Sequence, residues 1–437
     1  MDIFLLFIVL FVLLLAGFPV AFTLAGISII FGYFTFGIEF FYLLPLRIFG
    51  TMNNFVLIAV PMFVYMGVML EKSGIAERLL NTMAMLLGSL KGGLAVAVII
   101  VGALLAASTG IVGATVVTMG LLSLPAMLKR KYSPALATGT IASAGTLGQI
   151  IPPSIVLVLL GSVMNISVGE LFIGALLPGL LLVGLYIAYV IIVAVVNPAG
   201  APPVPKEEIA QFKKERSFSS IIRTFVLPLL LVLAVLGSIF AGIASPTEAA
   251  GVGAFVATLL TALEKKLSLK VLKEVMRETT FLTCMVFMIL MGATAFGLVF
   301  RGMEGDSTLV NLIEGAELSP YAFLAFVMVA IFIAGFFIDF IEIIFIFIPV
   351  VTPIFVAYDM NLLWIAILVS VNLQTSFLTP PFGFSLFYLK GVAPPSVKTG
   401  HLYKGILPFI AIQLLMLSLI IFFPEMVTWL PSLGGGK

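Results

Sequence analysis

Two related stretches of this sequence, AGTLGQIIPPS at residues 144–154 and QTSFLTPPFG at residues 374–383, decide the fold. Each lies inside an apolar segment and combines glycine with a Pro-Pro pair. Proline removes a backbone donor and glycine weakens a helix, so an unbroken ladder of helical hydrogen bonds cannot run through either stretch. The parts on either side are each too short to cross about 30 Å of hydrocarbon. We therefore predict two discontinuous membrane helices.

The composition places both stretches in a membrane protein. Hydrophobic residues make up 62% of the 437-residue chain and charged residues only 10%, whereas a soluble domain carries about 25% charged residues. The apolar segments have helix length and lack the roughly 10-residue alternation of outer-membrane strands. The predicted fold class is an all-α polytopic membrane protein. Cys284, the only cysteine, lies in an apolar run and is predicted to be a buried structural thiol. The chain also has a single histidine, His401, so redox and zinc chemistry are disfavoured.

Ten segments are predicted to cross the membrane: 3–16, 19–36, 54–70, 134–163, 170–196, 223–243, 247–263, 280–300, 361–390 and 405–424. Two further apolar stretches, 93–128 and 320–357, are interrupted near their middles, and we interpret them as hairpins. Parity alone does not separate a re-entrant hairpin from two full crossings. In this topology 19 of the 22 Lys and Arg residues fall on one side, and only Arg47, Arg301 and Lys437 on the other. The positive-inside rule then places both termini outside.

The chain also contains an internal repeat. When the sequence is slid along itself by 228 positions, four residue pairs align without a gap: Gly74 with Gly302, Pro125 with Pro353, Pro152 with Pro380 and Pro153 with Pro381. Each half then has five crossings and one hairpin, and an odd number of crossings turns the second half upside down relative to the first. Inverted repeats are typical of secondary transporters. Chance recurrence is the alternative, since Pro-Pro pairs also occur at 202–203 and 394–395.

Broken helices and hairpin turns have backbone groups that can bind ligands. Free carbonyls with Ser, Thr or Gln oxygens can hold a small hard cation, and half-helix N-termini favour an anionic substrate. Asp339, with Glu342 one turn further, is a functional-site hypothesis because intramembrane acids are costly. The alternative for Asp339 is a structural partner of a neighbouring backbone N–H. Ser108 and Thr109 have the alternative role of small residues that let helices approach closely.

Three motifs carry a family resemblance: the glycine-rich stretch ending in IPPS at 151–154, LTPPFG at 378–383, and LPG at 177–179. Over essentially the whole chain they resemble the large membrane subunit of a tripartite ATP-independent periplasmic (TRAP) transporter. The resemblance implies an elevator-type importer in a bacterial or archaeal inner membrane, driven by sodium. It also implies a periplasmic substrate-binding protein and a small four-helix membrane subunit as a separate chain. Residues 380–391 look closest to the branch associated with 2-oxo acids, lactate or related small organic acids.

The resemblance further implies a division into scaffold and transport domains and a set of site residues. Scaffold helices would occupy 1–92 and 223–319, transport-domain elements 93–196 and 320–437, and a cytoplasmic connector 197–222. The implied sites are sodium site 1 at Ser108, Thr109, Gly110, Gly145, Thr146 and Gly148, sodium site 2 at Gly335, Asp339, Gln374, Thr375 and Thr379, and a substrate site at Ser108, Pro153, Ser154, Thr379 and Pro381. Family members often have a Ser-Gly-Ser turn in the first hairpin. Here Ser-Thr-Gly-Ile stands at 108–111, which leaves the side-chain ligand at that turn open.

Other function classes remain as alternatives. The main rival is a binding-protein-independent organic-anion/sodium symporter, or a cation antiporter, of similar inverted-repeat fold. An ion channel fits less well, because two discontinuous helices in one chain point to an occluding site. The sequence has no HExxH motif, nucleophile–base pair or P-loop, so we expect neither an enzyme nor an ATPase, and no nucleic-acid partner.

Overall fold

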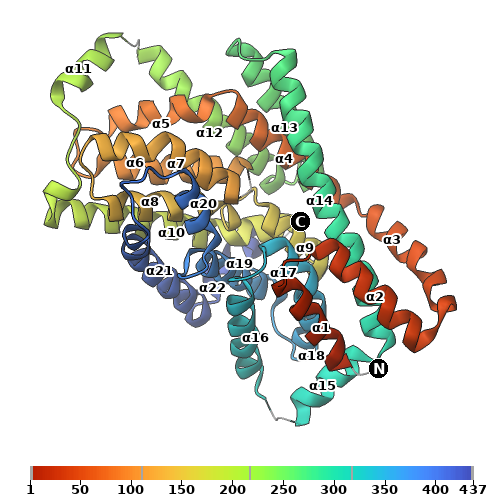
Figure 1. The fold of residues 1–437 in the computed structure, drawn as a ribbon. Helices are drawn as coiled ribbons and strands as arrows, with labels where there is room; N and C mark the ends of the chain where they lie inside the picture. The colour runs from red at the N-terminus through yellow and green to blue at the C-terminus, as the bar shows by residue number, and fades with distance from the viewer. Residues whose placement is uncertain (1–2, 110–111, 216–217, 316–317, 435–437) are drawn as a thin grey trace.

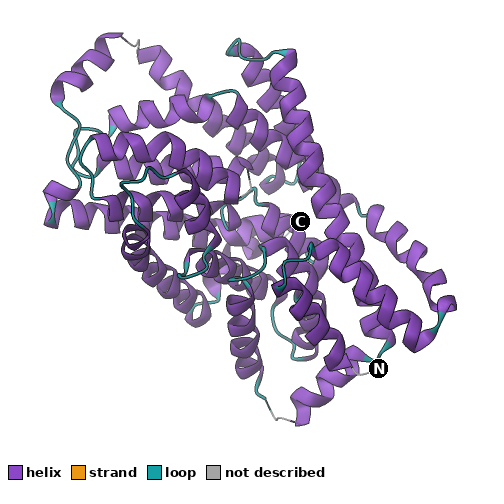
Figure 2. Cartoon of the chain, in the orientation of Figure 1, coloured by secondary structure: helices purple, strands orange, loops and turns teal. Residues whose placement is uncertain are grey.

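The computed structural model describes residues 3–109, 112–215, 218–315 and 318–434, with side chains for all of these except 106–109, 213, 215, 218–224, 312–314 and 434. The described chain folds into helices joined by short loops (Figure 1), and these residues contain no strand (Figure 2). The predicted all-α class is confirmed.

The described residues of the first half form ten α-helices. They are α1 (Ile3–Leu15), α2 (Val20–Phe36), α3 (Leu44–Met52), α4 (Ala59–Lys72), α5 (Ile75–Leu86), α6 (Gly93–Thr109), α7 (Val112–Lys129), α8 (Pro134–Thr146), α9 (Ile155–Met164) and α10 (Val168–Val196). Short 3-10 turns precede α3 (η1, Ile38–Leu43) and α4 (η2, Phe55–Ile58), and η3 (Leu147–Gln149) follows α8. After η4 (Pro198–Gly200), α11 (Lys206–Glu215) connects the two halves.

The second half repeats this order with variations. Its helices are α12 (Phe218–Phe240), α13 (Pro246–Leu263), α14 (Leu269–Gly302), α15 (Gly305–Gly315), α16 (Pro320–Ala334), α17 (Phe340–Ile346), α18 (Ile348–Ala357), α19 (Leu362–Leu378), α20 (Phe384–Val392), α21 (Thr399–Phe422) and α22 (Glu425–Gly434). Adding 228 to the bounds of α7 gives 340–357, the outer bounds of α17 and α18 together. The same shift moves the start of α8 to 362, where α19 begins. The repeat predicted from four residue pairs is therefore a structural repeat.

The packing of the two halves has the same pseudo-two-fold symmetry. Helix α2 packs along α14, and its counterpart α13 packs along α4, the counterpart of α14. The hairpins follow the same rule: α7 packs on α20, and α17 and α18 pack on α9. Figure 1 shows α14 running beside α2, while α6, α7, α8, α10 and α21 gather away from them. Each hairpin thus lies against the second part of the other half's broken helix.

Both discontinuous helices are present where the sequence predicts them. The segment 134–163 is formed by α8 and α9, and 361–390 by α19 and α20, with a Pro-Pro segment between the two parts in each case. Both Pro-Pro peptide bonds are cis. Six helices in the described residues are long and apolar enough to span a membrane by themselves, and the pair α17–α18, bent by 50°, makes up to seven. The remaining predicted crossings correspond to shorter apolar helices or to the two broken ones.

Two expectations need revision. The short helices α3, α5, α15 and α22 lie in stretches that the sequence assigned to loops, because their few turns are too short to stand out as apolar segments. The prediction that Cys284 is buried is wrong, since its side chain is exposed on α14. In a membrane helix an apolar run marks lipid-facing positions as well as core positions, so apolar neighbours do not imply burial.

Candidate functional site

The two broken helices meet at the centre of the repeat symmetry. Gln374 on α19 donates a hydrogen bond from Nε2 to Thr146 Oγ1 at the end of α8, over 3.3 Å, and the two residues are 228 positions apart. They are therefore equivalent residues in contact, which is geometrically possible only where the pseudo-two-fold axis passes between them. In an inverted repeat this axis lies in the membrane plane. The contact between Thr146 and Gln374 accordingly marks the middle depth of the protein.

A buried hydrogen-bonded chain continues from this point into the helices behind it. Thr375 Oγ1 lies 2.6 Å from Gln413 Oε1 on α21, and Gln413 Nε2 donates to Tyr186 Oη on α10 over 2.7 Å. Thr375, Gln413 and Tyr186 are fully buried. Gln413 and Tyr186 are 227 positions apart, so this pair also lies close to the pseudo-two-fold axis. No sequence pattern singled out Gln413 and Tyr186, because they sit inside ordinary apolar helices.

Next to this chain lie buried polar atoms without partners in the described part of the protein. Gln149, in the turn η3, is fully buried, and neither its Oε1 nor its Nε2 makes a hydrogen bond there. The same holds for Gln374 Oε1, Thr140 Oγ1 and Ser370 Oγ. An unpaired buried amide or hydroxyl costs about 1–3 kcal/mol, so most such groups have a partner. A water, a cation or a substrate oxygen or nitrogen can serve as that partner at Gln149.

Gln149 is absent from the sequence-derived site although it stands in the first broken stretch. The sequence could have indicated Gln149 as a site residue, because it is a long polar residue between Gly148 and the Pro-Pro pair, inside an apolar crossing. Polar residues in membrane segments usually face the protein interior. The burial of Gln149 agrees with that rule, and the missing partners distinguish it from the neighbouring hydroxyls.

The side chains around the breaks hydrogen-bond mainly to nearby carbonyls. Ser154 Oγ donates to Gln149 O over 3.0 Å, Thr379 Oγ1 to Thr375 O over 2.7 Å, and Ser385 Oγ to Phe377 O over 2.8 Å. These bonds satisfy carbonyls that the interrupted helices leave without a helical donor. The side-chain oxygens keep their acceptor lone pairs, which a cation can use.

The predicted sodium site 1 is partly outside the described structure. The side chains of Ser108 and Thr109, and all of Gly110, lie outside the described residues. The other three members, Gly145, Thr146 and Gly148, are buried at the end of α8 and in η3. A Cβ at Gly145 would lie 2.5 Å from Val116 Cγ2 on α7, so the second arm of the hairpin packs directly against the first break.

The predicted sodium site 2 is described in full, and the structure brings Gly335 to α19. A Cβ at Gly335 would lie 2.1 Å from Ser376 Oγ, which puts the hairpin turn against the helix that carries Gln374 and Thr375. Asp339 caps α17: its Oδ1 accepts from Phe340 N over 2.8 Å, and Glu342 Oε2 accepts from Asp339 N over 3.1 Å. This capping box is the structural role that the sequence left open for Asp339. Its assignment as a sodium ligand stays a prediction.

The predicted substrate residues differ in accessibility. Pro153 and Ser154 in the first break are buried, Thr379 is half-buried, and Pro381 in the second break is exposed. Pro381 O accepts a hydrogen bond from Tyr403 Oη over 3.2 Å, and the ring of Phe382 lies 5.3 Å from that of Phe337 in the hairpin turn. The second break is therefore the more open of the two.

The charge at the centre is low. Among the described residues, the buried polar set consists of Ser, Thr, Asn and Gln, with no Asp, Glu, Lys or Arg. The same residues contain no group of three or more His, Cys, Asp or Glu that could hold a metal ion. The buried polar atoms at the centre are thus the neutral oxygens and nitrogens of hydroxyls and amides.

Comparison with known proteins gives concordant relatives. The family of tripartite ATP-independent periplasmic transporter DctM components matches residues 7–426. The chain is 32% identical over 390 residues to the C4-dicarboxylate TRAP transporter large permease protein DctM of Pseudomonas aeruginosa, covering 89% of each protein. It is 30% identical over 424 residues to the sialic acid TRAP transporter large permease protein SiaM of Vibrio cholerae, covering 96% of each. The crystal structure of the Alcanivorax borkumensis YdaH transporter shares the fold, with a TM-score of 0.64, 14% identity and coverage of 95% of this chain and 97% of that one.

Proposed function

The chain belongs to the family of DctM components of tripartite ATP-independent periplasmic transporters, and from this premise we propose that it imports a small organic acid by sodium symport. It is a transporter permease subunit and not an enzyme. In the proposal it lies in the inner membrane with both termini on the periplasmic side. A periplasmic binding protein delivers the acid, and a small four-helix membrane subunit, as a separate chain, completes the complex.

The observation that carries the proposal is the meeting of the two broken helices on the pseudo-two-fold axis. Thr146 and Gln374 mark that point, and the unpartnered amide of Gln149 lies in the same buried polar region. A site on the axis of an inverted repeat is equivalent with respect to both membrane faces. This is the symmetry that alternating access needs. Oxygen atoms of hydroxyls, amides and interrupted helix ends supply the ligands.

The charge of the site supports the proposed sodium coupling. An organic acid brings negative charge into a region whose described buried residues include no Lys or Arg. Charge compensation then has to come from bound cations and from the half-helix dipoles. The carbonyl and hydroxyl oxygens at Gly145–Gly148 and at Gln374–Thr379 keep acceptor lone pairs, and with Gln149 as an additional oxygen donor they are suitable sodium ligands. Binding of the acid and of sodium would then favour each other, which is the requirement for symport.

The interlocked hairpins support an elevator motion. Because α7 packs on α20 and α17–α18 on α9, each hairpin is tied to the other half's broken helix, and the four elements form one unit. Helices α2, α4, α13 and α14 pack on one another as a second group. Between the groups, Thr118 Oγ1 on α7 donates to Glu71 Oε1 on α4 over 2.9 Å. In the proposal the first unit moves relative to the second, and the domain boundaries stay a prediction.

The substrate class follows from the relatives. The two relatives named above are permeases for C4-dicarboxylates and for sialic acid, and both kinds of solute carry a carboxylate. We extend the carboxylate to this chain's substrate and leave the rest of the molecule to experiment. A 2-oxo acid or a lactate-like acid is the sequence-based expectation.

The test is uptake by proteoliposomes that contain this chain, its small subunit and the binding protein. We expect uptake of a labelled organic acid only with an inward sodium gradient and with the binding protein present. Uptake in sodium-free buffer with a proton gradient that equals uptake with the sodium gradient would refute the proposed sodium coupling. Uptake by the membrane chains without the binding protein would instead favour the rival, a binding-protein-independent symporter. Uptake by vesicles containing Gly335→Ala protein, measured in the same way, tests the predicted sodium site 2.

A further inference from the structure

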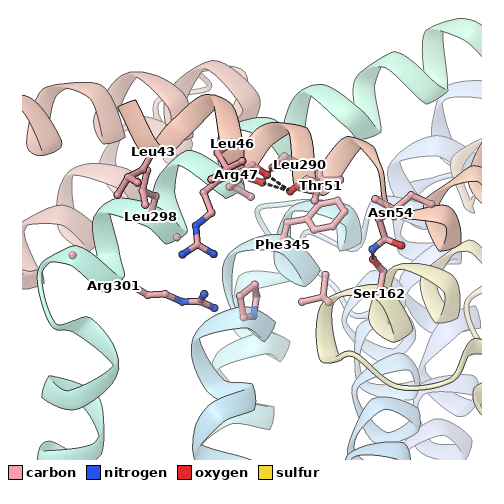
Figure 3. Close-up of a pocket in the computed structure, with 18 of the residues that line it drawn as sticks. Leu43, Leu46, Arg47, Thr51, Asn54, Ser162, Leu290, Leu298, Arg301 and Phe345 are labelled. Carbon is pink, nitrogen blue, oxygen red and sulfur yellow. Dashed lines mark hydrogen bonds between the residues drawn. The ribbon is translucent and has the colours of Figure 1, made fainter. Parts of the chain in front are cut away.

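A large cavity lies between α3 and α14 on one side and α17, α18 and the end of α9 on the other, and it is lined by none of the residues of the two Pro-Pro breaks. Its volume is about 910 Å³, within the range of about 300–1,000 Å³ typical of small-molecule sites. Leu46, Leu298 and Phe345 form part of its apolar wall, and Arg47 and Arg301 bring two guanidinium groups into it (Figure 3). The cavity therefore combines an apolar lining with two fixed positive charges.

The position of these two arginines is unusual. The chain has seven arginines, and only Arg47 and Arg301 fall on the outer side in the predicted topology. Both line the same cavity, although they are 254 positions apart and stand on separate helices, α3 and α14. Basic residues are disfavoured in outer loops. Two that converge on one cavity indicate a requirement for positive charge there.

Neither arginine has an arginine at the equivalent position of the other half, although Lys72, Lys273 and Arg277 lie within two positions of those equivalents. Shifted by 228 positions, Arg47 corresponds to Val275 and Arg301 to Ser73. A role in holding the fold together would be expected to recur in both halves, as the Pro-Pro pairs do. A role in receiving a solute that arrives from outside has no reason to recur on the inner face. Among the described residues Lys72 pairs with Glu278 over 2.8 Å, whereas no carboxylate pairs with Arg47, and this difference favours a ligand-related role for the outer pair.

The arginines have donors left for a ligand. Arg301 Nε lies 3.7 Å from Asp306 Oδ2, a distance at the outer limit for an ion pair, and both side chains are exposed. Within the described residues no carboxylate oxygen lies within 4.0 Å of the Arg47 guanidinium. A guanidinium group recognises a carboxylate through two parallel N–H donors. Each of the two guanidinium groups can thus bind a carboxylate that enters the cavity.

Polar side chains at the edge of the cavity are already paired with one another. Thr51 Oγ1 lies 3.3 Å from Thr294 Oγ1, and Asn54 Nδ2 donates to Ser162 Oγ over 2.9 Å. The second contact joins the start of the α4 segment to α9, the second part of the broken helix. The cavity therefore borders directly on the unit that contains the proposed transport site.

We propose that Arg47 and Arg301 form an outer reception site, which binds the carboxylate of the organic acid after its release from the binding protein and before it reaches the broken helices. The proposal rests on the proposed function for the identity of the anion. The apolar wall would accommodate the carbon skeleton while the arginines hold the charged end. An anionic lipid phosphate has similar chemistry and is distinguished below.

The first experiment measures the charge of the cavity without any substrate. Cys284→Ser removes the only cysteine, and Ala293→Cys then places a single thiol in the cavity wall. An anionic and a cationic methanethiosulfonate reagent are compared on the reconstituted complex. We expect the anion-to-cation rate ratio at position 293 to fall about tenfold when Arg47 and Arg301 are both changed to Gln, because charges at short range raise the local concentration of counter-ions.

The matched control is Ser319→Cys in the same background, an exposed position at the start of α16 outside the cavity lining. Its rate ratio should be unchanged by the two arginine substitutions, and its reactivity confirms the outward orientation. If the ratio at position 293 is equally indifferent to the two arginines, the cavity is not a positively charged site and the proposal fails.

The second experiment asks what binds. Succinate, pyruvate and N-acetylneuraminate, each compared with chloride at equal ionic strength, should slow labelling at position 293 and lose this effect in the Arg47→Gln/Arg301→Gln protein. No protection by any of the three would overturn the proposal. Protection that depends on phosphatidylglycerol instead, and disappears in phosphatidylcholine vesicles, would assign the site to a lipid and also overturn it.

Uptake separates this proposal from the proposed function. We expect Arg47→Gln to raise the KM for the transported acid several-fold while the sodium concentration for half-maximal uptake stays constant. A change in sodium dependence without a change in KM contradicts the reception role. Labelling and protection do not require transport, so they can succeed even if uptake proves independent of sodium, and they can fail while sodium symport holds.

Discussion

Replacing Gly335 with alanine puts a methyl group where the second hairpin touches α19. The added Cβ would lie 2.1 Å from Ser376 Oγ and 2.9 Å from Ser376 Cβ, whereas ordinary van der Waals contact begins at 3.4 Å. Both contacts are therefore too close, and the one with the hydroxyl oxygen is the closer of the two. The hydroxyl can rotate away, but the Ser376 Cβ cannot. Because the interior is close-packed, the hairpin turn itself has to move by about 0.5 Å or more to restore an ordinary carbon–carbon contact.

The cost can be estimated from the same contacts. Ser376 Oγ donates to Leu373 O over 2.9 Å in a buried environment, and losing such a bond costs about 1 kcal/mol. Overpacking of a tight interior adds roughly 1–3 kcal/mol unless the hairpin yields. If the hairpin yields, the predicted sodium ligands separate by a distance comparable to the ~0.5 Å tolerance of a binding site. We therefore expect the sodium concentration for half-maximal uptake to rise about tenfold or more.

The assay is a sodium titration of uptake, with thermal unfolding of the purified complex measured in parallel. The control is Gly184→Ala on α10, where an added Cβ has nothing within 4 Å; this change should leave sodium dependence unaltered. In the double variant with Ser376→Ala the 2.1 Å contact is gone and the 2.9 Å contact remains, so we expect partial recovery. If Gly335→Ala matches Gly184→Ala in both measurements, the hairpin turn is not positioned by α19 and the reasoning is refuted.

Three further outcomes follow from the same structure. Asp339→Asn keeps a side-chain oxygen for capping α17 and removes the charge, and Thr379→Ala removes a hydroxyl at the second break. Both substitutions should lower the sodium dependence of uptake without loss of folding. If sodium activates uptake by both variants as it does in the unchanged protein, neither residue belongs to the sodium site. Gln149→Leu replaces a buried amide that has no hydrogen-bond partner among the described residues by an apolar side chain of similar size. We therefore expect unchanged or higher thermal stability and at least a tenfold loss of uptake. Preserved uptake would show that the amide binds no ligand. Thr118→Val removes the hydrogen bond to Glu71. Loss of this bond should alter the rate of uptake but not its sodium dependence. An altered sodium titration would contradict a role confined to the contact between the two helix groups.

The membrane crossings, the helix breaks and the internal repeat were predictable because each depends on the residues of a short stretch of sequence. Apolar segments of helix length place the crossings, and the Pro-Pro segments mark the breaks that separate α8 from α9 and α19 from α20. The internal repeat was readable because both halves keep their prolines in register, and the same offset relates the helix bounds. The short helices α3, α5, α15 and α22 were not predicted, since a few turns with mixed polarity have the hydropathy pattern of a loop.

The candidate site was predictable in its region but not in its contacts. The sequence marked residues 145–154 and 374–383, and these stretches do meet, through Thr146 and Gln374. It left the capping role of Asp339 open as an alternative, and it did not indicate that Gln413 and Tyr186 extend the buried network. Such contacts join residues far apart in the chain, and hydropathy says nothing about which buried faces meet.

By itself, then, the sequence determined the membrane class, the crossings, the breaks and the inverted repeat, because each follows from the local cost of placing polar backbone or charge in hydrocarbon. Only the tertiary structure decided which hairpin lies against which broken helix, which polar atoms of Gln149 stay without a partner in the described part of the chain, and that Arg47 and Arg301 line one cavity. These features depend on close packing between segments that are distant in the chain, where shape and symmetry select the neighbours.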